Sequence, residues 1–345
     1  MTPQRRTAAT VPRPRRAGWA LITALLAVAA LLAGCSNIDS TFTQRAGGGD
    51  GDQVVRVGTL RGQPHLFAPF FWDGFLPAGT VADVVVFDSS PDVKNALVSG
   101  QIDVAVMGVP AMLAGAAAQQ DVRLVAASAD GGSAIVGRPE IADVKALRGK
   151  RVGYPVGSSQ EVLLRSTLRA NGIDPDAEVT LVNLTFADMA NAYASGQIDA
   201  FSSAELGPSV AKQKGAHDIV SPYDTPVGKV NIGLATTQRV IDADPDLVRR
   251  VVAAHTEAVH HMDTHRDEWQ RRVVAEFGLD PVVAASAIAN TWPRADLAPG
   301  YLAQVAALAR EMARLGQLPA APEMSTFVDD SFQPSASAPK QEAQK

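Results

Sequence analysis

The sequence predicts an α/β protein with two similar lobes, each a mostly parallel sheet flanked by helices. The main observation is a repeat, because Ser-Gly-Gln-Ile-Asp occurs at residues 99–103 and again at residues 195–199. Around each copy, apolar β-branched runs alternate with helical segments that carry recognisable caps. Strands that alternate with helices form parallel sheets, so one unit used twice indicates two lobes.

Composition is consistent with this architecture. The 345 residues are 46% hydrophobic and 19% charged, which is an ordinary globular composition with enough length for two domains. The first 34 residues hold five arginines and no acidic residue, so removing them lowers the formal net charge from −5 to −10. Such acidity argues against nucleic acid as a partner and against a polybasic membrane patch.

Residues 1–34 have the pattern of a secretory signal peptide. Five arginines precede a nearly unbroken apolar run at 17–33, and Leu32-Ala33-Gly34 leads into Cys35, the only cysteine. A single cysteine also excludes an intramolecular disulfide framework. The alternative, a plain transmembrane anchor, is disfavoured because the apolar run is near the short limit for a span. Residues 35–53 are glycine-rich and are expected to form a flexible tether.

The first lobe is expected to comprise residues 54–129 and 229–330. Its β-propensity predicts strands at 54–60, 81–87, 102–107, 122–128 and 230–236. Ser89 caps a helix that has a proline in its first turn and stops at Gly100. Helices are also expected to begin at residue 65 and to cover 111–119, 245–277 and 281–315, while the polar residues 331–345 are expected to be disordered.

The second lobe is expected to comprise residues 130–228. Strands are predicted at 134–137, 178–183 and 198–202. Ser158 and Glu161 form a capping box for a helix that runs to Arg169, and Thr185 caps the second repeat helix. The turn-rich segments 130–133 and 225–228 are the expected hinges between the lobes.

Two chain crossings between two α/β lobes would leave a cleft. In open parallel sheets, ligands lie beyond the carboxyl ends of the strands. The candidate ligand-binding residues chosen on this basis are Gln63, His65, Ser89, Ser90, Gly108, Gly157, Ser158, Ser159, Glu205 and Asn231.

The chemistry of these residues suits a small polar or anionic solute. Gly157-Ser158-Ser159 opens a helix, so backbone N–H groups and the positive end of the helix dipole favour sulfonate, carboxylate, phosphate or nitrate oxygens. Ser89 and Ser90 offer a smaller version from the other lobe, although all these serines could serve only as caps. Ionised Glu205 accepts hydrogen bonds only, so it would favour an amine or ring N–H, unless it is simply a surface carboxylate.

Two further groups of titratable residues are interpreted as structural. Asp103 and Asp199 occupy equivalent places in the two repeats, where a carboxylate that accepts from nearby backbone N–H groups explains both without catalysis. Four histidines fall on one predicted helix, at positions 255, 260, 261 and 265, and two of them have metal-ligand spacing. Charged neighbours and the lack of an HExxH motif favour a solvated face over a metal site.

Several segments, in their order along the chain, carry a resemblance to a known family: Val55-Arg56-Val57-Gly58, residues 96–103, 147–152, 157–159 and 192–200, and Glu205 with nearby Pro208. The chain resembles extracytoplasmic solute-binding proteins of ABC importers, in the branch of nitrate, alkanesulfonate, taurine and thiamine-precursor binders. This resemblance implies a type II periplasmic-binding-protein-like fold, hinge-linked by two chain crossings. Leu32-Ala33-Gly34-Cys35 likewise resembles the lipobox of bacterial lipoproteins, whose cysteine is lipidated.

The resemblance implies a binding protein rather than an enzyme. It would capture a sulfonate, a nitrate-like anion or a pyrimidine-like solute and deliver it to a membrane permease. The chain has no Gly-x-x-x-x-Gly-Lys loop, so the ATPase would be a separate subunit. No cofactor or metal is expected, and the protein would be a monomer anchored through lipid on Cys35 at the outer face of a bacterial cell membrane.

An enzyme on the same fold is the alternative. Related chains include a desulfinase with a cysteine nucleophile and a pyrimidine synthase that consumes its own histidine. The mature chain has no cysteine beyond the anchor and no Gly-x-Ser-x-Gly elbow, and His65 is the only candidate for the second chemistry.

Overall fold

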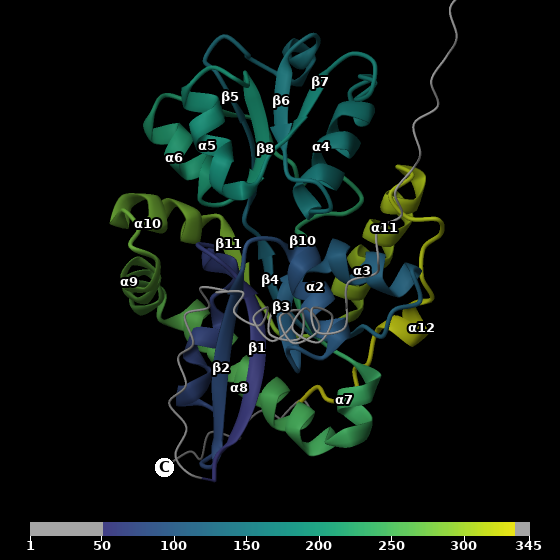
Figure 1. Cartoon of the computed structure of the whole chain (residues 1–345). Coiled ribbons are helices and arrows are strands. Elements are labelled where there is room, and N and C mark those ends of the chain that lie inside the picture. Colours follow the sequence, from purple (N-terminus) through teal and green to yellow (C-terminus); the bar gives the residue numbers. More distant parts are fainter. Residues whose placement is uncertain (1–50, 335–345) are drawn as a thin grey trace, which may run out of the picture. The chain divides into compact units, whose positions relative to one another are not determined.

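The computed structural model describes residues 51–334, which form two sheets with flanking helices (Figure 1). The expected signal peptide and Cys35 lie outside the described residues, as do most of the tether and residues 335–345 of the tail. Within residues 51–334, no helix combines the length and the apolar character that a membrane span requires.

The six-stranded sheet has the order β11-β4-β10-β3-β1-β2. Its strands are β1 (Gln53–Leu60), β2 (Thr80–Phe87), β3 (Val104–Gly108), β4 (Arg123–Gly131), β10 (Val230–Thr236) and β11 (Thr291–Pro293). β1 is parallel to β2 and β3, whereas β10 is antiparallel to both β3 and β4. The antiparallel β10 is the strand by which the chain returns from the other sheet.

The five-stranded sheet has the order β7-β6-β8-β5-β9. Its strands are β5 (Ser133–Gly137), β6 (Arg151–Tyr154), β7 (Thr180–Asn183), β8 (Ala200–Ala204) and β9 (His217–Val220). β6 is parallel to β7 and β8, and β5 is antiparallel to β8 and β9. Both sheets are therefore mixed, and in each the strand that enters from the other sheet is antiparallel.

The two faces of the five-stranded sheet pack against two separate hydrophobic cores. Ile135 faces α4 (Ser159–Ala170), whereas its neighbours Ala134 and Val136 face α5 (Phe186–Ala194) and α6 (Gly207–Gln213). Figure 1 shows α4 on one side of this sheet and α5 and α6 on the other. Successive side chains of a strand point to opposite faces, so an apolar strand with helices on both faces is fully buried.

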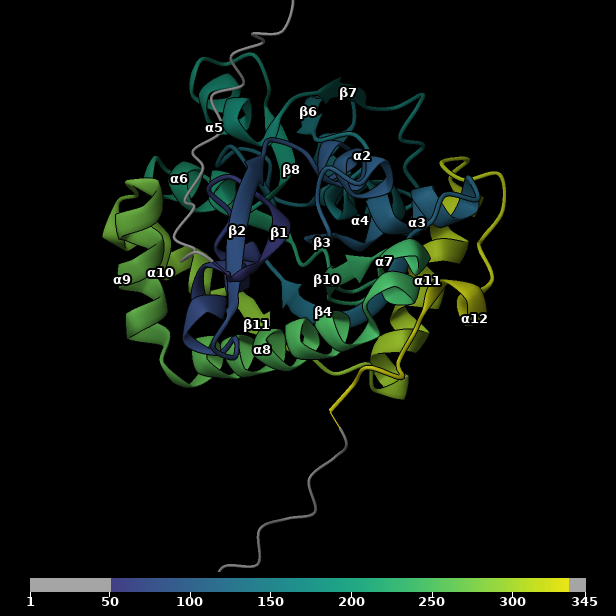
Figure 2. The same cartoon turned by 60° about the horizontal axis from the view of Figure 1, so that its bottom comes forward.

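The remaining helices accompany the six-stranded sheet. They are α2 (Ser90–Ser99), α3 (Val109–Ala117), α7 (Gln238–Ala243), α8 (Pro245–Thr264), α9 (Arg266–Phe277), α10 (Pro281–Ala289), α11 (Pro299–Arg314) and α12 (Met324–Phe327). In Figure 2, α8 crosses beneath β11 and β4, and it contacts both strands. Short 3-10 helices cover Pro64–Leu66, Ala68–Gly74 and Val144–Leu147.

The predicted helix caps are confirmed. Ser89 Oγ accepts from the Asp92 N–H at 3.3 Å and Thr185 Oγ1 accepts from the Asp188 N–H at 3.3 Å, so both repeat helices begin in the same way. Ser158 Oγ accepts from the Glu161 N–H at 3.3 Å, and Glu161 Oε2 accepts from the Gly157 N–H at 2.9 Å. Each of these contacts satisfies a donor that the first helical turn leaves unpaired.

The two repeat aspartates make the same contacts in both sheets. Asp103 Oδ2 accepts from the Arg56 backbone N–H at 2.9 Å, and its Oδ1 accepts from Arg56 Nη2 at 2.7 Å. Asp199 binds Arg151 through the same atoms at the same distances, 2.9 Å and 2.7 Å. The structural role predicted for both carboxylates is confirmed, and their arginine partners are an addition.

The repeated isoleucine explains a second shared feature, a glycine two residues after each arginine. A Cβ atom at Gly58 would lie 2.5 Å from Ile102 Cδ1, and one at Gly153 would lie 2.7 Å from Ile198 Cδ1. Contacts this short do not occur between real side chains, so a larger residue at either position would force the isoleucine to shift within a buried core. The repeat is therefore the scaffold of each sheet.

Several expectations about the C-terminal half are wrong. The predicted helix at 245–277 is interrupted at His265, and the one at 281–315 contains a strand, β11, between α10 and α11. The alanine-rich segment suggested continuous helix, but β11 adds to the edge of β4 instead. In the N-terminal half, the helix expected from residue 65 is present as two short 3-10 helices, Pro64–Leu66 and Ala68–Gly74. The sequence did not predict β6, α6, β9, α7 or α12.

Two further corrections concern burial. His255 does not share a solvated face with the other histidines: it is fully buried, and its Nε2 lies 2.8 Å from the Ala127 carbonyl oxygen of β4. Residues 331–334 are not disordered, because Phe332 is buried and Gln333 Nε2 donates to the Val125 carbonyl oxygen at 2.7 Å.

Candidate functional site

Two neighbouring cavities lie where strands of both sheets end and helices begin. The inner cavity has a volume of about 10 Å³ and is lined by residues that follow β1, β3, β8 and the start of α4. The outer cavity has a volume of about 280 Å³ and is lined by the starts of α2, α4 and α5. Ser90, Ser158 and Phe186 line both cavities, so the two form one continuous candidate site.

Most of the predicted site residues meet here. The inner cavity contains Gln63, His65, Ser90, Gly108, Ser158, Ser159 and Asn231. Ser89 and Gly157 line the outer cavity. Glu205 lines neither of them.

The inner cavity collects buried polar atoms that have no hydrogen-bond partner among the described residues. These atoms are Gln63 Oε1, His65 Nδ1 and Ser159 Oγ. Their residues are only 5%, 2% and 2% exposed. Buried polar atoms are normally paired, so three unpaired atoms around one cavity indicate a place where a polar ligand or water binds.

The serines of the site differ in what their hydroxyl groups can still do. Ser158 Oγ accepts from the Glu161 N–H and donates to the Pro155 carbonyl oxygen at 2.6 Å. Ser90 Oγ accepts from the Gly108 N–H at 3.1 Å. Ser159 Oγ makes no hydrogen bond to the described residues. Ser158 therefore acts as a cap, and Ser159 carries the hydroxyl that is available to a ligand.

The inner cavity is electrically neutral apart from the dipole of α4. Complete burial lowers the pKa of His65 to about 3, so its ring is uncharged at neutral pH. Two hydrogen bonds of Gln160 hold the first turn of α4 in place. Its Nε2 donates to Ser133 Oγ at 2.8 Å, and its carbonyl oxygen accepts from Ser202 Oγ at 2.9 Å. An anionic ligand would thus be held by neutral donors and the helix terminus.

The outer cavity is mainly apolar. Pro91, Pro155, Val156, Leu184 and Phe186 supply its apolar walls. Val156 is 56% exposed, which is unusual for a large apolar side chain at the edge of a cavity. Two carboxylates at the rim already have partners, since Asp88 pairs with Arg61 at 3.0 Å and Asp188 accepts from Thr185 Oγ1 at 2.7 Å.

Sequence reasoning missed the segment between β7 and α5, which lines the outer cavity with residues 183–186. The repeat contained the signal that could have identified it. Thr185 aligns with Ser89, so the second copy of the loop was equivalent to a segment already chosen for the site. The structure places the two copies on the same cavity.

Glu205 is buried away from these cavities. It is 1% exposed, and its Oε2 accepts from Ser209 Oγ at 2.7 Å and from the Ser209 N–H at 3.2 Å. Its Oε1 accepts from Asn290 Nδ2 at 3.1 Å. The interpretation of Glu205 as a surface carboxylate is wrong, and its ligand contact stays a prediction that these internal contacts do not favour.

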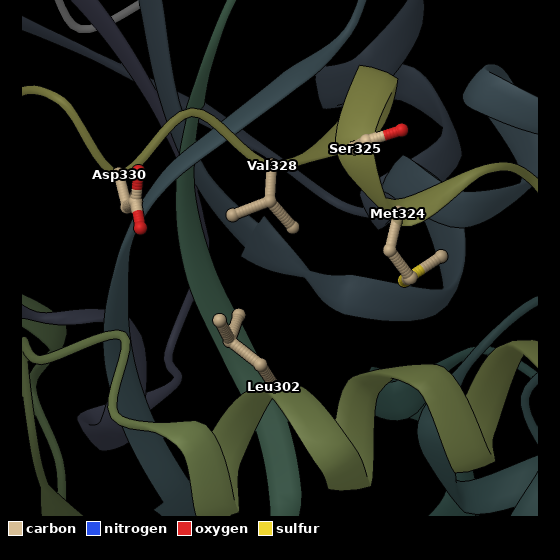
Figure 3. Close-up of a pocket in the computed structure, with 5 residues that line it drawn as sticks. All are labelled: Leu302, Met324, Ser325, Val328 and Asp330. Carbon is tan, nitrogen blue, oxygen red and sulfur yellow. The ribbon is translucent and has the colours of Figure 1, made fainter.

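A larger cavity of about 360 Å³ lies between α11 and the C-terminal segment that includes α12. Figure 3 shows Leu302 of α11 and Val328 pointing toward one another across it. Its other lining residues are Met324, Ser325 and Asp330. None of these five side chains has a buried polar atom without a partner, so we do not assign this cavity to ligand binding.

The histidines near the end of α8 do not form a metal centre. His261 Nε2 lies 3.0 Å from Glu268 Oε2, and the rings of His261 and His265 stack with centroids 4.2 Å apart. Across residues 51–334, no group of three or more His, Cys, Asp or Glu side chains is arranged to hold a metal ion.

Comparison with solved structures defines the class of fold. The alkanesulfonate-binding protein SsuA from Xanthomonas axonopodis pv. citri, bound to MOPS, has a TM-score of 0.71 at 22% identity, covering 80% of this chain and 98% of that one. The nitrate-binding protein NrtA from Synechocystis PCC 6803 has a TM-score of 0.66 at 14% identity, covering 81% and 87%. The fold is therefore that of periplasmic binding proteins.

Sequence comparison defines the family. The model of the NMT1/THI5-like family matches residues 79–268, which is more than half of the chain, and the chain belongs to this family. The putative aliphatic sulfonates-binding protein of Bacillus subtilis is 28% identical over 282 residues, covering 78% of this chain and 82% of that protein. The family resemblance carried by the sequence motifs is confirmed.

Proposed function

We propose that the protein is the extracytoplasmic solute-binding component of an ABC importer. Its relatives are named as binding proteins for sulfonate and nitrate. The observation that carries the proposal is the inner cavity, whose lining includes Gln63, His65 and Ser159, each with a buried polar atom that has no hydrogen-bond partner among the described residues. At about 10 Å³ the inner cavity has room for no more than one water molecule, so a solute would bind there only after the two sheets separate, with its head group at these atoms and its remainder in the outer cavity of about 280 Å³.

The solute is a small organic molecule with a polar or anionic head group. Neutral donors at the start of α4 suit sulfonate oxygens or a pyrimidine ring. The apolar outer cavity favours an organic solute over an inorganic anion such as nitrate, because apolar walls gain free energy only from apolar ligand surface.

Equilibrium binding to a panel of solutes tests this proposal. Wild-type protein is titrated by calorimetry with ethanesulfonate, taurine, nitrate and an aminopyrimidine. We expect saturable one-to-one binding of an organic member, weakened about tenfold in Ser159→Ala, the usual effect of losing one hydrogen bond to a charged group. Ser195→Ala is the matched control, because Ser195 Oγ donates to the Ala192 carbonyl oxygen within the repeat and lies outside both cavities. Equal affinities of the two variants would remove Ser159 from the site.

The proposal includes a lipid anchor on Cys35 and action at the outer face of the cell membrane. The residues concerned lie outside the described range, so the proposal rests on the lipobox-like sequence alone. Labelling cells with a palmitate analogue tests it. Wild-type protein should carry the label and Cys35→Ser should not, while an equally labelled Cys35→Ser variant would contradict the anchor.

An enzyme on the same fold remains the second candidate, because His65 lies in the inner cavity. Its neutral ring would be the reactive group. Intact-protein mass after incubation with each solute separates the two functions. A binding protein keeps its mass and releases the solute unchanged, whereas loss of mass from the histidine or recovery of an altered solute would favour the enzyme.

A further inference from the structure

The contacts of Glu205 join parts of the chain that belong to different sheets. Glu205 follows β8 of the five-stranded sheet, and Asn290 lies between α10 and β11 beside the six-stranded sheet. Asn290 Nδ2 donates to Glu205 Oε1 at 3.1 Å. A second contact runs parallel to it, since Ser209 Oγ of α6 lies 3.0 Å from Ser286 Oγ of α10.

The geometry around this contact allows no simple rearrangement. Asn290 Nδ2 also donates to the Ser133 carbonyl oxygen at 3.1 Å, so two acceptors face this nitrogen. The Tyr223 hydroxyl lies 3.2 Å from Asn290 Oδ1 and 2.8 Å from the Ser133 carbonyl oxygen, and its one proton is shared between them. The amide is therefore fixed with its nitrogen toward Glu205. All donors to the Glu205 carboxyl group are uncharged side-chain or backbone groups, so this buried polar group depends on Ser209 and Asn290 for its hydrogen bonds. Removal of one such partner is costly, because a buried polar atom would be left unpaired.

Both residues are also attached to the point where the chain crosses between the sheets. β4 ends at Gly131 and β5 begins at Ser133, so Gly132 alone separates them. The Gly132 N–H donates to the Asn290 carbonyl oxygen at 2.7 Å, and the Gly132 carbonyl oxygen accepts from the Glu205 N–H at 2.9 Å. A rotation at Gly132 would therefore alter the geometry of the Asn290–Glu205 hydrogen bond directly.

We propose that Glu205 is a positioning residue, whose hydrogen bond to Asn290 fixes the angle between the two sheets at the Gly132 crossing. It acts on ligand affinity without touching the ligand. Only a protein in the closed arrangement encloses the inner cavity, so apparent affinity scales with the fraction of molecules in that arrangement. This inference rests on the proposed function only for its effect on affinity, because the effect on the sheet angle needs no ligand.

A double-mutant cycle with reversed hydrogen-bond roles tests the pairing. Glu205→Gln leaves one acceptor oxygen for donors on two sides, and because the Ser209 backbone N–H requires that oxygen, the introduced amide nitrogen faces Asn290 Nδ2; Asn290→Asp sets two carboxyl groups against each other. In the double variant, the introduced glutamine amide donates to the introduced aspartate carboxylate, which restores one hydrogen bond in the opposite direction. Loss of the Ser133 contact is common to Asn290→Asp and the double variant, so it cancels from the coupling.

The distance between spin labels reports the sheet angle in ligand-free protein. Labels are placed at Asn95 and Asn191, exposed and repeat-equivalent positions on α2 and α5, in a Cys35→Ser background. We expect each single variant to lower the closed-to-open ratio about three- to tenfold, the effect of losing one buried hydrogen bond. The double variant should recover much of that ratio. Glu140→Gln, at an exposed site, is the matched control and should leave the distance unchanged.

Additional variants keep the test decisive if a charged substitution prevents folding. Ser286→Ala removes only the parallel contact to Ser209, and we expect a smaller shift in the same direction. Unchanged label distances in Ser286→Ala and in every folded member of the cycle would overturn the inference. The inference would also be overturned if the closed-to-open ratio of the double variant fell by the product of the two single-variant factors, because the two residues would then be uncoupled.

Ligand binding separates a positioning residue from a contact residue. With ethanesulfonate and taurine as probes, Glu205→Gln should weaken whichever of them bind by a similar factor. Weakening of taurine alone, with an unchanged label distance, would mean that Glu205 contacts the amine and would refute the positioning role. If neither probe binds, the proposed function is in question, but the label distances still decide the role of Glu205.

Discussion

Acid should destabilise this protein through two buried histidines. Burial lowers the pKa of His65 to about 3 and that of His255 to about 4, whereas an unfolded histidine titrates near 6.5. As pH falls below about 6.5, the unfolded chain takes up protons that the folded chain cannot, so the free energy of unfolding decreases. Stability from these rings is complete above about pH 7 and is lost as pH falls toward the folded pKa values.

The size of the effect follows from those values. Between pH 8 and pH 5, each histidine reduces the free energy of unfolding by about 2 kcal/mol, since near pH 5 the unfolded ring is protonated and the folded ring is not. Urea unfolding at both pH values measures it. His65→Gln and His255→Gln should each diminish the loss by about 2 kcal/mol. His260→Gln, at an exposed position of α8, is the control and should leave the loss unchanged. A His65→Gln loss equal to that of wild type would show that His65 is not held neutral in the fold.

Three further predictions concern the scaffold and the outer cavity. Asp103→Ala and Asp199→Ala should lower the melting temperature by similar amounts, because their contacts are the same; a change in only one variant would contradict the equivalence of the repeats. Gly153→Ala should cost about 1–3 kcal/mol in urea unfolding, since its Cβ would overlap Ile198; an unchanged midpoint would argue against that packing. Phe186→Ala should weaken binding of a long-chain sulfonate relative to a short one, and equal weakening of both would exclude the outer cavity from contact with the chain.

The sequence predicted the parts of the fold that depend on local patterns. Strands of both sheets, three side-chain caps and the structural role of Asp103 and Asp199 follow from periodicity, capping chemistry and the repeat. The parts that failed depend on tertiary context. β11 lies within an alanine-rich, helix-favouring region and exists because β4 offers an unpaired edge. His255 is buried because α8 packs on β4, which helical periodicity around charged neighbours did not reveal.

The candidate site was predicted in outline but not in its division of roles. The rule that ligands lie beyond strand ends brought Gln63, His65 and Ser159 together correctly as neighbours of one cavity. It could not tell that the hydroxyl group of Ser158 is used as a cap while that of Ser159 is available. Nor could it place Glu205, whose partners Ser209 and Asn290 belong to segments beside different sheets.

The measurement that tests the central claim most directly is native mass spectrometry of the purified protein after incubation with the solute panel. We predict a one-to-one complex with an organic solute, a much smaller complexed fraction for Ser159→Ala, and release of the solute with its mass unchanged. No complex with any member of the panel, equal complexes for wild type and Ser159→Ala, or release of a chemically altered solute would contradict a solute-binding protein that holds its ligand in the inner cavity.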